Sequence, residues 1–314
     1  MNHLSMKIIK ILSNTWRLLK QAGKEFINDN CVKLSASLSY YTIFSIGPML
    51  IIIIACAGIF WGPAAVAGNL YHEIKEMIGS EAALQIQNIV ANIQKTQQST
   101  SAAIIGIVLL VVGATGVFVE IQDSINYIWS IRAKPKKGWL KFLTNRLISF
   151  SLIISCAFIL LVSLVVNAIV EVLSDRLEVY FKDVTIISFY VVNLLIIFAI
   201  ITILFAIIFK VLPDAIIRWK DVLVGAAFTA LLFMIGKFLI GLYLGKSNVG
   251  LTYGAAGSII VIISWVYYSS LILYFGAEFT KVYALRHGAG IKPVETAVFI
   301  IKREAKEIPE SQLG

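Results

Sequence analysis

The sequence predicts an all-α polytopic membrane protein with six transmembrane helices and an amphipathic helix at its N-terminus. Its 314 residues are 59% hydrophobic and only 14% charged, with a mean hydropathy of +0.86, whereas soluble domains carry about 25% charged residues. The apolar residues stand in long blocks, and about 20 apolar residues suffice for a helix to cross a bilayer. Barrel strands are about 10 residues long and alternate in polarity, so these blocks favour helices.

Residues 1–36 are predicted to be a cytoplasmic N-terminal region in which residues 5–30 form an amphipathic helix. Apolar side chains recur there at intervals of three or four, and lysines and one arginine supply the polar side. Such a helix suits the headgroup layer of the membrane, and the alternative is a basic helix packed on the bundle. The apolar positions are Ile8, Leu12, Trp16, Leu19, Ala22 and Phe26.

Residues 37–285 are predicted to be the membrane domain. The six spans are expected at about residues 38–60, 102–119, 147–170, 186–209, 222–243 and 256–280. The longest connection, residues 62–101, should form a helical loop on the extracytoplasmic side. Residues 286–314 form a polar cytoplasmic tail, in which we expect one short helix, Val294–Lys306.

The distribution of basic residues predicts the orientation. Of the 27 lysines and arginines, 21 fall on the side of the two termini. The other side holds the remaining six, which are Lys75, Lys95, Arg176, Lys182, Lys237 and Lys246. Because cytoplasmic loops carry the excess of Lys and Arg, both termini are placed in the cytoplasm. The net charge of +9 is then explained by this excess of basic residues in cytoplasmic segments, and we expect no nucleic-acid partner.

The last span carries a polar stripe on an otherwise apolar helix. At about 100° per residue, five polar side chains fall on one side of this helix. They are Ser264, Tyr267, Ser270, Tyr274 and Glu278. In lipid, such a stripe should face protein or water rather than acyl chains.

The first span has a comparable face, formed by Ser37, Tyr41, Ser45 and Pro48. Pro48 should kink the helix, because it cannot donate a backbone hydrogen bond. Kinks beside polar faces often line cavities in transporters, whereas the alternative for both stripes is hydrogen bonding between helices. We take these four residues and the five of the last span as candidate cavity-lining residues for an amphipathic or lipid-like substrate.

Motifs for known catalytic chemistry are missing from the sequence. The three histidines have no metal-ligand spacing, and the three cysteines have no paired spacing. There is no P-loop and no G-x-S-x-G element. We therefore predict no catalytic, cofactor-binding or metal-binding residues, no cofactor and no enzyme activity. Four acids near cytoplasmic span ends could in principle support a metal-dependent nuclease, although ordinary solvation is the favoured role: Glu120, Asp123, Asp214 and Glu278.

Four segments, in this order, resemble the YihY/virulence factor BrkB family of bacterial inner-membrane proteins, once described as ribonuclease BN. They are ASLSYYTIFSIGPML (residues 36–50), INYIW (125–129), VLPDA (211–215) and, in the last span, YGAAGS…WVYYS…GAEF. The resemblance covers about residues 15–285. It implies a multi-pass protein of the bacterial inner membrane, similar to proteins linked with envelope integrity and serum resistance, for which transport is suggested.

We therefore expect a protein that transports or handles a solute or envelope lipid without an ATPase of its own. The first alternative is a non-transporting envelope scaffold whose glycine faces, at Gly241 and Gly257, serve oligomerisation. The second is the ribonuclease of the older family description. The expected partners are the lipid bilayer and a lipid or small-molecule substrate, and a homo-oligomer is possible.

Overall fold

The computed structural model describes residues 3–45, 80, 83–84, 86–87, 116–134, 184–246 and 257–302. Its helices are α1 (His3–Asn28), α7 (Val184–Val211), α8 (Trp219–Lys246) and α10 (Gly257–His287), with further helical residues at 31–45 and 116–128. The short strands are β1 (Ile131–Ala133), β2 (Ala215–Ile216), β3 (Lys292–Pro293) and β4 (Ala297–Phe299). The predicted span at 147–170 lies outside the described residues, as do Pro48 and most of the spans at 38–60 and 102–119 and of the loop 62–101.

Three helices are long and apolar enough to cross a membrane: Val191–Val211, Trp219–Tyr243 and Ile259–His287. They coincide with the predicted spans at 186–209, 222–243 and 256–280. Many large apolar side chains on them are exposed, among them Leu195, Phe238 and Tyr243. A mostly helical chain whose long helices present apolar side chains outward is typical of a protein surrounded by lipid.

Helices α8 and α10 approach closely because a glycine on each faces a threonine on the other. A Cβ atom at Gly225 would overlap the side chain of Thr280, and one at Gly276 would overlap that of Thr229. Both threonine hydroxyls donate to the carbonyl four residues earlier in their own helix, at 2.7 Å. Each hydroxyl is therefore satisfied within its own helix while the side chain fills the space over the opposite glycine.

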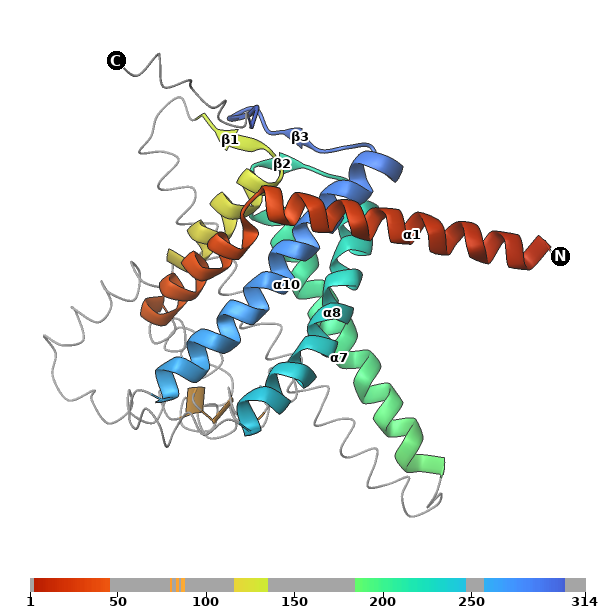
Figure 1. Ribbon diagram of the computed structural model, residues 1–314, viewed down its shortest axis with the longest axis vertical. Helices are drawn as coiled ribbons and strands as arrows, with labels where there is room; N and C mark the ends of the chain where they lie inside the picture. Colours follow the sequence, from red (N-terminus) through yellow and green to blue (C-terminus); the bar gives the residue numbers. More distant parts are fainter. Residues whose placement is uncertain are drawn as a thin grey trace, which may run out of the picture.

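Helix α1 lies across one end of the bundle, at a steep angle to α8 and α10 (Figure 1). Its second half packs on α10, where Leu18 and Ala22 join a buried cluster with Phe279 and Val282. Its first half extends away from the bundle (Figure 1), and Trp16 is 68% exposed. The part of α1 from Leu18 on thus agrees with the packed alternative for this helix, and Trp16, just before that part, is an uncovered apolar side chain.

The chain after α10 folds back under the same end of the bundle (Figure 1). Strand β4 pairs antiparallel with β1, with Arg132 opposite Val298, and β3 pairs with β2, with Ile216 opposite Lys292. We call residues 131–134, 212–218 and 288–302 the cap, and residues 288–302 alone the strap. Gly290, with φ 77°, supports the sharp turn that begins the strap.

The predicted helix Val294–Lys306 is wrong for the part of it that the structure describes. Residues 297–299 form β4, and the strap is held by backbone hydrogen bonds from Val294 N to Asp214 O and from Ile300 N to Ser130 O. These partners lie far away in the sequence. Local periodicity cannot reveal them, because a short strand is stabilised by the segment that it pairs with.

Candidate functional site

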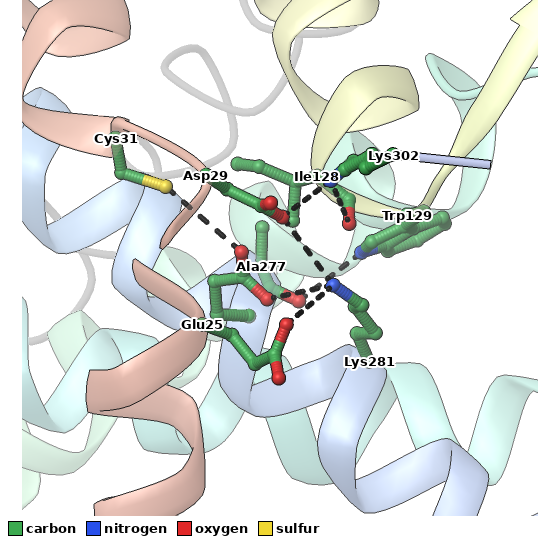
Figure 2. Close-up of polar contacts among 9 residues, drawn as sticks. Glu25, Asp29, Cys31, Ile128, Trp129, Ala277, Lys281 and Lys302 are labelled. Atoms are coloured by element: carbon green, nitrogen blue, oxygen red, sulfur yellow. Dashed lines mark hydrogen bonds and ion pairs between the residues drawn. The ribbon is translucent and has the colours of Figure 1, made fainter. Parts of the chain in front are cut away.

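A tight turn after α1 positions the first residues of the candidate site. Helix α1 ends at Asn28, and Asn30 adopts φ 52°, a left-handed conformation that Asn tolerates better than most residues. The Asn30 carbonyl then accepts from Lys33 N and Leu34 N, which starts the next helix. The turn brings Asp29 and Cys31 against α10, as Figure 2 shows.

Lys281 is the centre of a buried acid–base cluster (Figure 2). Its Nζ lies 3.2 Å from Glu278 Oε2, 3.4 Å from Asp29 Oδ2 and 3.7 Å from Glu25 Oε2. Lys302, in the strap, forms a second ion pair with Asp29. The cluster therefore connects α1, its turn, α10 and the strap.

The five charged side chains of this cluster differ in exposure. The exposed fraction is 0% for Glu278, 4% for Asp29, 12% for Lys281, 23% for Lys302 and 34% for Glu25. A buried charge is costly unless it is paired and hydrogen-bonded. The cluster thus runs from a fully buried carboxyl to a partly exposed one.

Two further groups complete the surroundings of Glu278. The Cys31 Sγ lies 4.0 Å from Glu278 Oε1, and burial, with the neighbouring carboxylates of Glu278 and Asp29, raises the pKa of this thiol. Burial lowers the pKa of Lys302, although its hydrogen bond to Asp29 opposes the shift. The Lys302 ammonium also lies 4.3 Å from the centre of the Tyr127 ring, a cation–π contact that favours its charged form.

The cluster lies where three of the resembling sequence segments meet. Trp129 of INYIW donates from Nε1 to the carbonyl of Ala277 in GAEF, at 3.1 Å. Asn126 of INYIW donates to Asp214 Oδ2 of VLPDA and accepts from its backbone N, both at 2.8 Å. Glu278 itself belongs to GAEF. Segments that are distant in the sequence are thus joined by hydrogen bonds at the cap.

The family model for virulence factor BrkB matches residues 22–298. The chain belongs to the virulence factor BrkB family. The matched range includes all of the cluster except Lys302.

Relatives of this BrkB-family chain are membrane proteins by name. A UPF0761 membrane protein of Saccharophagus degradans is 27% identical over 266 residues, 84% of this chain and 58% of the relative. One of Rhodospirillum centenum is 28% identical over 84% of this chain and 56% of the relative. One of Tolumonas auensis is 26% identical over 81% of this chain and 80% of the relative. The chain thus spans little more than half the length of the first two relatives. No solved structure matches the chain.

The predicted stripe of the last span becomes more buried toward the cap. Ser264 and Tyr267 are half-buried, whereas Ser270, Tyr274 and Glu278 are buried. The Ser270 hydroxyl donates to Val266 O in its own helix, at 2.7 Å. The Tyr274 hydroxyl is buried near Ser124, and it makes no hydrogen bond of good geometry with the described residues.

The predicted face of the first span packs, in its described part, on residues 116–128. Ser45 is buried, Ser37 is half-buried and Tyr41 is 44% exposed. A Cβ atom at Gly116 would lie 3.5 Å from Ser45 Oγ and 3.6 Å from Tyr41 Cδ1. Pro48, the fourth residue of this face, lies outside the described residues.

The sequence reading missed most partners of Glu278. The i,i+3 spacing of Glu278 and Lys281 is a local signal that could have been found. Asp29, Cys31 and Lys302 come from the other end of the chain or from the strap, and no local pattern connects them to Glu278. Solvation, the favoured role for this acid, is wrong, because its side chain is 0% exposed. No group of three or more His, Cys, Asp or Glu in the described part of the chain is arranged to hold a metal ion.

Proposed function

We propose that this BrkB-family protein is a six-span bacterial inner-membrane protein with both termini in the cytoplasm, which transports or handles a solute or envelope lipid without its own ATPase. The membrane location is supported by the names of its relatives and by the three long apolar helices. The orientation is supported by the excess of Lys and Arg on the side of the termini. The cap would then be the cytoplasmic end of the bundle.

The observation that carries the proposal is the pair of buried polar groups in the last span, Tyr274 and Glu278. A buried polar group without a partner costs about 1–3 kcal/mol, and acidic side chains within membrane helices generally mark a pathway or site. The Tyr274 hydroxyl is buried near Ser124 of residues 116–128 and has no hydrogen bond of good geometry to the described residues. A substrate or water that reaches it would supply the missing partner.

Two serine hydroxyls in the same part of α10 have their hydrogen-bond acceptors within that helix. Ser269 and Ser270 both donate to carbonyls of α10 itself, at 2.9 and 2.7 Å. In hydrogen bonding between helices, these hydroxyls would instead reach a neighbouring helix. In the described residues these two hydroxyls therefore make no hydrogen bond between helices, and Ser269 is not one of the stripe residues.

Reconstitution tests the proposal. Purified protein in liposomes should accelerate the exchange of fluorescent phospholipids between leaflets, or the flux of a small solute, over empty liposomes. Glu278→Gln should reduce this rate by about tenfold or more, since a hydrogen bond to a charged group contributes about 1.5–3 kcal/mol. Glu295→Gln is the matched control, because the Glu295 side chain is exposed and lies outside the cluster, and its rate should stay near that of the wild type.

Two results would contradict transport. Equal rates with and without protein, for both lipids and solutes, would favour a scaffold, in which Gly241→Leu should then disrupt an oligomer. Nuclease activity that survives stringent repurification and disappears in Glu278→Gln would instead support the older family description.

A further inference from the structure

The cluster at the cap contains one carboxyl more than it contains ammonium groups. Glu25, Asp29 and Glu278 supply three carboxyls, and Lys281 and Lys302 supply two ammonium groups. If every group were charged, one negative charge would remain in a site that is largely shielded from water. An uncompensated buried charge is expensive, so a neutral carboxyl within the cluster is the arrangement of lower free energy.

Of the three carboxyls, Glu278 has the least positive charge and the least water around it to stabilise its ionised form. Asp29 pairs with both Lys281 and Lys302, and Glu25 is partly exposed to water. Glu278 is 0% exposed, and among the described residues it forms an ion pair only with Lys281, which it shares with the two other carboxyls. Its Oε1 lies 4.0 Å from the thiol of Cys31, which is a weak hydrogen-bond donor, and the Asp29 carboxyl is a further neighbour of the same charge.

We propose that Glu278 is a proton-binding site, at which the buried carboxyl takes up and releases one exchangeable proton. Binding converts the carboxylate to the neutral acid, and release returns the proton to water, so no other reactant is needed. The Tyr274 hydroxyl, buried and without a hydrogen bond of good geometry to the described residues, lies one helical turn before Glu278 on the same stripe. The ligand class of the site is H⁺, and a role of this proton in driving transport rests on the function proposed above.

Titratable groups surround the site from every packed element. The helix α1 and the turn after it supply Glu25, Asp29 and Cys31, α10 supplies Tyr274 and Lys281, and the strap supplies Lys302. Residues 116–128 supply Glu120, whose charge interacts with the Tyr274 hydroxyl. Lys281 bridges the buried Glu278 and the partly exposed Glu25. This bridge gives the proton a route to the solution on the cap side. The ion pair between Lys302 and Asp29 closes the site with the strap.

Infrared difference spectroscopy of the full-length protein in a lipid bilayer tests the site directly. At near-neutral pH, the wild type should show the carbonyl-stretch band of a neutral buried carboxyl group. This band should be lost in Glu278→Gln and retained in Glu295→Gln, which removes an exposed carboxyl outside the cluster. A wild-type spectrum without the band, or a band that persists in Glu278→Gln, would overturn the proposal.

Two milder variants keep the test decisive if Glu278→Gln fails to fold. Cys31→Ser replaces a weak donor by a stronger one, so the band should shift in frequency if the proton is on Glu278. Lys302→Gln removes one positive charge, so the band should persist to higher pH than in the wild type. An unchanged band in both variants would overturn the assignment. Because none of these readouts depends on flux, a failed transport assay would leave the proton site standing, and the reverse also holds.

Discussion

At the scale of single residues, the reactivity of the Cys31 thiol measures whether this side chain is buried beside Glu278. Its side chain is 0% exposed and touches Glu278, and burial raises the pKa of its thiol. The thiolate is the reactive form, so a raised pKa means that less of it is present at any given pH. We expect alkylation by N-ethylmaleimide to be slowed by more than about tenfold, since each pKa unit changes the thiolate fraction about tenfold. The rate should also keep rising with pH after an exposed cysteine has levelled off.

The control for this prediction is an exposed thiol on the neighbouring helix α1. Cys56→Ala and Cys156→Ala leave Cys31 as the sole cysteine, and Lys24→Cys in a Cys31→Ser background gives the reference, because Lys24 is exposed on α1. Mass spectrometry over a pH series measures both rates. Equal rates that level off at the same pH would show that Cys31 is open to solvent.

At the scale of helices, the crossing of α8 and α10 depends on Gly276 and Gly225. Gly276→Ala places a methyl group against the Thr229 side chain, and overpacking of this kind costs about 1–3 kcal/mol. Thermal unfolding in detergent, followed by circular dichroism, should therefore show a lower midpoint than the wild type. The double variant Gly276→Ala with Thr229→Gly should recover part of the loss, because the opposing side chain is removed.

Gly23→Ala on α1 is the matched control for this helix crossing. A Cβ atom at Gly23 meets nothing within 4 Å, and alanine is favoured over glycine in a helix by about 0.5–1 kcal/mol. Its midpoint should equal or exceed that of the wild type. Equal midpoints for Gly276→Ala and the wild type would mean that the two helices do not approach as closely as described.

The helices and the strands differ in how much of them the sequence could predict. Helices α1, α7 and α8 begin and end within three residues of the predicted positions, at 5–30, 186–209 and 222–243, whereas α10 continues seven residues past the predicted range of 256–280. Long apolar runs and helical periodicity are local signals, so they can be recognised in the sequence without knowledge of the tertiary contacts. The strands of the cap pair segments from the middle of the chain with the strap, and two or three residues carry no periodic pattern of their own.

The candidate site was predictable to a similar, limited degree. The stripe on the last span was visible because its members recur with the period of one helix, and that set contains both Tyr274 and Glu278. The charge balance around Glu278 was not visible, because Asp29 and Lys302 reach it only through the turn at Asn30 and the return of the strap. Burial of the acid follows from that assembly rather than from its position in α10.

At the scale of the whole molecule, the cap joins both ends of the described chain. The end of α1, residues 131–134, residues 212–218 and the strap all lie at one end of the bundle (Figure 1), and Asp29 pairs with both α10 and the strap. An assembly that buries charged side chains at one end forms as a unit on one side of the membrane. The four segments must therefore share a compartment, which makes the proposed topology testable at several positions at once.

Cysteine scanning with a membrane-impermeant maleimide provides this test, in a background that lacks the three native cysteines. Cysteines in place of Arg132, Arg218 and Lys292, which are exposed at the cap, should be labelled in inside-out vesicles and protected in intact spheroplasts. A cysteine in place of Lys182, which the charge pattern places on the opposite side, should show the reverse. Labelling of the three cap positions from outside, with protection at position 182, would invert the orientation. A split among the cap positions would contradict the cap itself, because paired strands cannot lie on opposite sides of a bilayer.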